Sequence, residues 1–172
     1  MEWLRNFENQ GFVILDGGLA TELERRGHDL DHHLWSARLL LEAPEEIRKV
    51  HMDFLNAGVD CIISANYQSS VQGFMGEGLS QVESELLIQR AVRIAIEARD
   101  EFLLQNEDSQ RVQPLVATSI GPYGAFLADG SEYRGDYAAS CEEIRSFHES
   151  RWNLLQNSGA DFFAIETIPS IQ

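Results

Sequence analysis

The sequence predicts an α/β fold built from parallel β/α units, and three observations support this class. Short apolar runs recur along the chain, helical patterns fill the intervals between them, and a polar or glycine-rich turn follows each run. The starts of successive runs lie 47, 55 and 47 residues apart, which leaves room for a helical crossover between parallel strands. Four runs are interpreted as buried strands: FVIL (12–15), VDCIIS (59–64), PLVATS (114–119) and DFFAI (161–165).

The intervals between the runs carry sequence signals for helix boundaries. The segment APEEIRKVHMDFLNAG (43–58) opens with a proline and two glutamates and closes with Gly58, as helix ends prefer. SQVE (80–83) and SCEE (140–143) match the capping box, in which a serine and a glutamate three residues later bond each other's backbone amides. These patterns predict helices, and Gly159 is expected to end the last of them.

The composition limits the classes of function. With 172 residues, 44% of them hydrophobic, the chain is long enough for one domain over residues 1–172. Acidic residues outnumber basic ones by 28 to 13, and the net charge of -15 disfavours nucleic acid and anionic membrane surfaces as partners. The N-terminus lacks the apolar core of a signal peptide, and no apolar stretch is long enough to span a membrane, so a cytoplasmic location is expected.

The two cysteines, Cys61 and Cys141, lie 80 positions apart and form no CxxC pair. This spacing favours neither a disulfide framework nor a zinc site, so both are expected to be free thiols. Cys61 lies within an apolar run, where a thiol behaves as a small hydrophobic group. No metal site is therefore predicted from the residues of this chain.

The turns that follow the four runs carry the candidate functional residues. They are Asp16-Gly17-Gly18, Ser64 to Tyr67, Ser119 to Gly124, and Glu166-Thr167. An open doubly wound sheet and a closed barrel both fit alternating strands and helices, but a doubly wound sheet concentrates its ligand at one switch point. Because all four turns contribute to one rim, we favour a partial TIM barrel with about the first four strands. A full barrel takes about 250 residues, so the C-terminal half would be absent from this chain.

Five blocks of sequence occur in order between Phe12 and Pro169: DGGLATELERRG, LWSARLL, NYQSSVQGF, SIGPYGAFLADGSEYRGDY and AIETIP. Together they resemble the homocysteine S-methyltransferase family, most closely its members that use S-methylmethionine or S-adenosylmethionine as methyl donor. The resemblance implies a TIM barrel, a zinc ion that activates the thiol of homocysteine, and methyl transfer to form methionine. It also implies three zinc-binding cysteines in the second half of the barrel, and these are not present here. The chain alone is therefore expected to be inactive.

Two carboxylates of the rim are the first candidates for substrate binding. An amino-acid substrate presents an ammonium group, and the resemblance assigns Asp16 and Glu166 to the binding of homocysteine. Asp16 could instead be the N-cap of the following helix, and Glu166 could be paired with a basic residue. Gly17 lets the backbone approach a ligand and expose N–H groups, although a tight turn explains this glycine equally well.

A second group of candidates rests on the resemblance. It implies that Ser36 and Asn66 bind the carboxylate of homocysteine, that Tyr67 lies against the sulfur, and that Trp35 borders the pocket. Buried aromatic side chains belong more often to a core than to a pocket, so this alternative stays open for the two aromatics. Tyr123, in a long segment after the third run, is expected to form part of the wall on the methyl-donor side.

Two functional classes remain open. The first is a zinc-dependent homocysteine S-methyltransferase of which this chain is the N-terminal half, with homocysteine and a methyl-sulfonium donor as its partners. The second is a non-catalytic half-barrel module for binding or assembly, which associates with the missing C-terminal half or with a second copy of itself. A third interpretation is a different α/β barrel that uses Asp16 and Glu166 as an acid/base pair. The residues alone assign no catalytic group.

Overall fold

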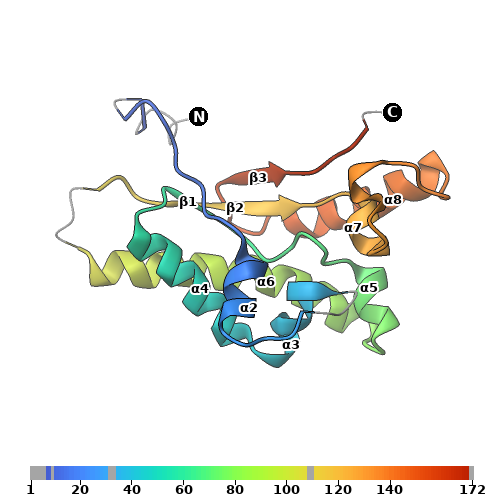
Figure 1. Cartoon of the computed structure of the whole chain (residues 1–172), viewed down its shortest axis with the longest axis horizontal. Helices are drawn as coiled ribbons and strands as arrows, with labels where there is room; N and C mark the ends of the chain where they lie inside the picture. The colour runs from blue at the N-terminus through green and yellow to red at the C-terminus, as the bar shows by residue number, and fades with distance from the viewer. Residues whose placement is uncertain (1–6, 9, 31–33, 108–110, 171–172) are drawn as a thin grey trace.

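The computed structural model describes residues 7–8, 10–30, 34–107 and 111–170, and it shows a parallel sheet flanked by helices (Figure 1). In this part of the chain the sheet has three strands in the order β1-β2-β3, which are Cys61–Ile63, Leu115–Ile120 and Phe162–Ile165. Neighbouring strands are parallel, with Cys61 opposite Leu115 and Ala117 opposite Phe162. The α/β class with parallel strands is thereby confirmed.

The helices begin at the predicted signals. Both capping boxes are confirmed, because the side chains of Ser80 and Ser140 each accept the backbone amide of the glutamate three residues later. Gly58 ends its helix in the left-handed conformation, whereas the last helix ends at Leu155 and not at Gly159, so that prediction is wrong. The helices are α2 Leu19–Arg25, α3 Leu39–Glu42, α4 Pro44–Ala57, α5 Val71–Gly76, α6 Gln81–Gln105, α7 Tyr123–Leu127 and α8 Cys141–Leu155, with 3-10 helices η1 Trp35–Arg38 and η2 Ser131–Tyr133.

Two Gly-x-Asp turns, which end in Asp60 and Asp161, lead from a helix into a strand. The glycines of both turns have a positive φ, which reverses the chain after the helix at little cost. Asp60 Oδ2 accepts the backbone amide of Ile14 at 2.8 Å, and Asp161 Oδ2 accepts that of Val116 at 2.8 Å. Each aspartate also donates its own amide to the carbonyl of that same residue. Both strands are therefore aligned against the segment that precedes them in the sheet.

The apolar run 12–15 does not form a buried strand, so this prediction is wrong. The run makes a single parallel bridge, Leu15 with Cys61, and its side chains are 36% to 61% exposed. The ladder is short because aspartate side chains accept the next backbone amides, Asp60 on one side of the bridge and Asp16 on the other. The described residues place no second strand beside the run, and its apolar side chains stay uncovered.

The sheet is packed more heavily on one face than on the other. In Figure 1, α4 and α6 lie on the same side of the sheet. Ile62 and Val116 pack there against Leu55 of α4 and Ala95 of α6. The alternate residues of β1 and β2 point to the opposite face, where Phe7 packs on them. Among the helices that the structure describes, none is both long and apolar enough to cross a bilayer.

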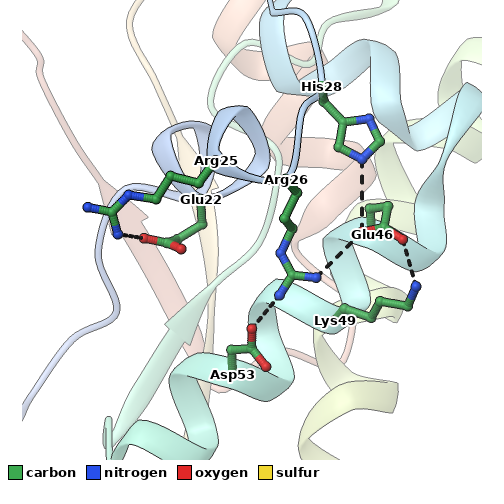
Figure 2. Close-up of polar contacts among 7 residues, drawn as sticks. All are labelled: Glu22, Arg25, Arg26, His28, Glu46, Lys49 and Asp53. Carbon is green, nitrogen blue, oxygen red and sulfur yellow. Dashed lines mark hydrogen bonds and ion pairs between the residues drawn. The ribbon is translucent and has the colours of Figure 1, made fainter.

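Ion pairs join the end of α2 to α4, as Figure 2 shows. Arg26, directly after α2, contacts Asp53 and lies 3.4 Å from Glu46 of α4. His28 Nε2 lies 3.9 Å from the same Glu46 carboxylate. Exposed pairs of this kind contribute little each, so the full burial of Leu23 in the core supplies most of the attachment. The helix that follows the 12–15 run is thus held in a defined place.

Candidate functional site

The carboxyl ends of the strands bring Asp16 and Glu166 to one rim. Asp16 follows the bridge at Leu15, and its Oδ2 accepts the backbone amide of Ile63 at 2.9 Å. Glu166 follows β3, and its Oε1 accepts a hydrogen bond from Ser119 Oγ at 2.6 Å. Burial raises the pKa of Asp16 to about 7 against the opposing effect of the Ile63 bond, and the charge of Glu166 adds to the rise. The two carboxyl groups therefore share one electrostatic environment.

The structure distinguishes between the alternatives for these two side chains. The N-cap position of α2 is Gly18, and it makes no side-chain cap bond, so Asp16 is not a helix cap. Within the described residues Glu166 forms no ion pair with a basic group, and a serine hydroxyl is its partner. Both carboxyl groups therefore keep acceptor oxygens available at the rim.

A chain of hydrogen bonds connects Glu166 to the inside of the molecule. Ser119, whose hydroxyl bonds Glu166, donates its backbone amide to Ser64 Oγ at 3.2 Å. The Ser64 hydroxyl donates to Asn66 Oδ1 at 2.6 Å, and Asn66 Nδ2 donates to the carbonyl of Ile88 in α6 at 2.8 Å. Asn66 is fully buried and both ends of its amide are engaged, which favours a role in holding the loop after β1. Its predicted contact with the substrate carboxylate stays a prediction.

Tyr67 lies at the same rim, half-buried beside Glu166. Burial raises the pKa of its phenol, a hydrogen bond with Thr167 opposes the rise, and nearby acidic groups, Glu132 and Glu166 among them, add to it. Tyr67 can pack this closely on the loop after β2 because residue 121 is a glycine. A Cβ at Gly121 would lie 2.4 Å from the Tyr67 carbonyl oxygen and 2.8 Å from its ring. The structure thus brings Asp16, Tyr67 and Glu166 together.

Arg151 of α8 is hydrogen-bonded to the loops that form this rim, and the sequence analysis did not identify it. Its Nη1 donates to the carbonyl of Gly121 at 2.8 Å, and its Nη2 donates to the carbonyls of Asn66 at 2.8 Å and Tyr67 at 3.3 Å. The side chain is fully buried, and burial lowers its pKa to about 10. One guanidinium therefore joins the loops that follow β1 and β2. The sequence signal was its spacing, four residues after Phe147 on the buried side of the helix.

Three other predicted residues are placed less completely. Trp35 and Ser36 open η1, but their side chains lie outside what the structure describes, so their roles stay predictions. Gly17 is exposed, and a Cβ there would meet only ordinary contacts with Phe54 at 3.5 Å. Local packing therefore does not demand glycine at this position, and approach of a ligand remains the open explanation.

Tyr123 lies in a separate aromatic cluster. Its ring centroid is 5.1 Å from that of Phe147, 5.5 Å from that of Tyr137 and 5.7 Å from that of Phe126. The cluster borders an open cavity of about 450 Å³, lined by Gln72, Tyr123, Phe126, Glu142, Glu143, Ser146 and Phe147. The rim carboxyl groups do not line this cavity, so we locate the candidate site at the rim, where the polar groups converge. A role of Tyr123 in the donor wall stays a prediction.

The described residues do not fit the zinc ion that the resemblance implies. Cys61 is buried, and burial raises the pKa of its thiol to about 12, which disfavours the thiolate that a metal requires. Cys141 is exposed at the start of α8. Over the described part of the chain, no three His, Cys, Asp or Glu side chains are grouped to hold a metal ion. No chemical step is therefore assigned here to a metal.

The fold and the rim together define an α/β protein with its candidate site at the carboxyl ends of parallel strands. Residues 13–172 match the family model described as homocysteine S-methyltransferase. The chain therefore belongs to the homocysteine S-methyltransferase family.

Relatives and solved structures agree with this family. The chain is 53% identical to homocysteine S-methyltransferase YbgG of Bacillus subtilis, over 92% of this chain and 51% of the relative. It is 49% identical to a selenocysteine Se-methyltransferase of Brassica oleracea, over 95% of this chain and 49% of the relative. The metallated form of the homocysteine methyltransferase MmuM from Escherichia coli superposes with a TM-score of 0.88 at 47% identity, over 98% of this chain and 58% of that one. The chain spans about half the length of the curated relatives it matches.

Proposed function

We propose that the complete protein transfers a methyl group from a sulfonium donor to homocysteine, forming methionine, and that this chain supplies the homocysteine pocket. The donor is S-methylmethionine or S-adenosylmethionine, as the sequence blocks imply. The observation that carries the proposal is the convergence of Asp16 and Glu166 from distant parts of the chain. Two acidic groups that the described structure leaves without a basic partner suit the ammonium group of an amino acid.

The ammonium group of homocysteine lies between the two carboxyl groups in this proposal. The hydroxyl of Ser119 holds Glu166, and the amide of Ile63 holds Asp16. A bound cation favours the charged form of Asp16, so its pKa falls from about 7 and the site releases a proton at neutral pH. The backbone at Gly17 gives the ligand a close approach.

The other end of homocysteine is assigned to the second group of candidates. Ser36 and Asn66 bind the substrate carboxylate in this proposal. Tyr67 lies against the sulfur and Trp35 borders the pocket, while Tyr123 contributes to the wall on the donor side. The rim position of Tyr67, next to Glu166, supports its part in this assignment.

The residues of this chain act by orientation. Methyl transfer requires the sulfur of homocysteine, the methyl carbon and the leaving sulfur to lie in line, and a fixed ammonium site sets one end of that line. A zinc ion, when bound, supplies deprotonation of the thiol. Its cysteine ligands would come from outside this chain, because the described residues do not fit a metal.

We further propose that the run 12–15 and strands β1 to β3 are the first four strands of a TIM barrel. Their parallel arrangement in chain order supports this, as do the exposed apolar side chains at the two edges, such as Phe12 (61%) and Ile165 (64%). The missing C-terminal half covers these edges in the complete protein. Self-association is the alternative, which would make the chain a non-catalytic assembly module. A cytoplasmic location completes the proposal.

Titration calorimetry of the chain with homocysteine tests the proposed pocket. Asp16→Asn and Glu166→Gln should each weaken binding by about 1.5 to 3 kcal/mol, the range for a hydrogen bond to a charged group. Glu24→Gln, which removes an exposed acid of α2, is the matched control and should leave binding unchanged. When the titration is repeated in buffers of different ionisation enthalpy, the released proton should make the observed binding enthalpy depend on the buffer. This dependence should vanish in Asp16→Asn. Unchanged affinity in both rim variants would contradict the proposal.

A further inference from the structure

Glu132 is a buried acid whose position the packing of the protein does not explain. It lies in η2, is only 6% exposed, and within the described residues its Oε2 has no hydrogen-bond partner. Burying a carboxyl oxygen without a partner costs free energy. A group that destabilises the fold and is nonetheless held in place is a candidate for ligand binding.

The segment around Glu132 is tightly packed, so the side chain is held and not loosely placed. A Cβ at Gly124 would lie 2.4 Å from the backbone nitrogen of Glu132, which shows how closely η2 approaches α7. Asp129 Oδ1 accepts the backbone amide of Ser131 at 2.9 Å and fixes the turn before it. The backbone therefore directs this carboxyl group to one place.

That place is beside Tyr67. Gly121 packs against the carbonyl and ring of Tyr67, and Gly124, three residues later, packs against the backbone of Glu132, so Tyr67 and Glu132 flank the same short segment. The charges of Glu132 and Glu166 both act on the Tyr67 phenol. Among the described residues Arg151 forms no ion pair with Glu132, and its guanidinium donates to backbone carbonyls on the loops after β1 and β2. The rim thus carries an acidic and aromatic side that is distinct from the pair formed by Asp16 and Glu166.

We propose that Glu132 and Tyr67 form the part of the site that receives the positively charged sulfonium of the methyl donor. This rests on the proposed function, in which homocysteine, with its positive ammonium group, and a sulfonium donor bind together. The ammonium group of homocysteine occupies Asp16 and Glu166, so a second cation needs a second anion. A sulfonium has a diffuse charge and no N–H donors, and a carboxylate beside an aromatic ring suits such a cation.

Binding of matched sulfonium and thioether pairs to the chain tests the proposal. The pairs are S-methylmethionine with methionine, and S-adenosylmethionine with S-adenosylhomocysteine, and the members of each differ by one methyl group and one charge. Glu132→Gln should weaken binding of one sulfonium about tenfold or more and leave its thioether within about twofold. Asp136→Asn is the matched control, because it removes an exposed acid four residues after Glu132. This control should change the binding of neither the sulfonium nor the thioether.

Two further measurements separate this proposal from its alternatives. Homocysteine affinity should stay unchanged in Glu132→Gln and fall in Asp16→Asn, so failure of the homocysteine pocket and failure of the sulfonium site give different patterns. The urea midpoint of Glu132→Gln should be no lower than that of the parent, because a partnerless buried acid is removed. A lowered midpoint with equal losses for sulfonium and thioether would make Glu132 structural and overturn the proposal. Absence of sulfonium binding by the parent chain would overturn it too.

Discussion

Strand β2 and the run 12–15 flank β1 on opposite sides, and their surroundings differ completely. Every residue of β2 is buried, whereas all four side chains of the run are at least 36% exposed. β2 has a strand on each side, while the run has one bridge and aspartate side chains that end its ladder. Burial of an apolar segment is thus decided by its neighbours and not by its composition. The sheet is therefore well packed at its centre and exposed to solvent at this edge.

The candidate site spans both regions. Asp16 is attached to the open edge, and Glu166 is bonded to Ser119 in the central strand. One carboxyl group is therefore held by a well-packed framework, and the other by a segment with few contacts. Variants that act on the centre and on the edge should separate these two contributions.

Arg151→Met should give the largest loss of stability. Methionine fills much of the space but removes the donors to the carbonyls of Tyr67 and Gly121, together with one of the two donors to the carbonyl of Asn66, which keeps the backbone amide of Ser69. We expect the free energy of unfolding to fall by about 3 kcal/mol, measured by urea denaturation. Arg134→Met, which removes an exposed arginine, should cost less than about 0.5 kcal/mol. Similar small losses in both would show that the buried guanidinium does not stabilise the centre.

A pair of valine substitutions compares the two flanks of β1 directly. Val116→Ala removes fully buried methyl groups from β2 and should lower the free energy of unfolding by about 2 kcal/mol. Val13→Ala removes the same groups from the exposed run 12–15 and should change the free energy of unfolding by less than about 0.5 kcal/mol. Urea denaturation of both variants measures the difference. A loss at Val13 as large as that at Val116 would mean that a partner covers the run in solution.

The pH dependence of stability reports on Asp16. The folded-state pKa of about 7 lies above the usual 3.8, so the folded state binds the extra proton between these values. Its contribution is complete below about pH 4 and is lost as the pH rises through about 7. Relative to Asp16→Asn, the parent should lose about 1 kcal/mol or more between pH 4.5 and pH 8, measured by urea denaturation. A constant difference between the two proteins would show that Asp16 is not buried as described.

Features set by nearby residues were predictable from the sequence. The capping boxes at Ser80 and Ser140 require only a serine and a glutamate three residues apart, and both form. The runs that became β1, β2 and β3 have neighbours on the sheet and became strands. The run 12–15 is at least as apolar but lacks a second neighbour, and no local pattern encodes that difference.

Features that depend on contacts between distant residues were harder to predict from the sequence. Asp16 before two glycines fits a helix cap as well as a ligand group, and only the fold excludes the cap, because Gly18 is the N-cap of α2 and Asp16 accepts the amide of Ile63 instead. Ser119 was noted as a turn residue, but its bond to Glu166 depends on the pairing of β2 with β3. Arg151 and Glu132 were missed because a charged residue on a helix or in a turn is usually exposed. The roles proposed for them depend on burial, which tertiary packing creates.

The two Gly-x-Asp turns have a consequence for how the protein is made. Asp60 engages Ile14, and Asp161 engages Val116, so in each case the partner has left the ribosome before the aspartate does. An incoming strand can find its register against a segment that is already present, without waiting for later sequence. Assembly of the sheet can therefore follow the direction of synthesis, one β/α unit after another, and a nascent chain would bring Asp16 and Glu166 together only after the last of these units has been made.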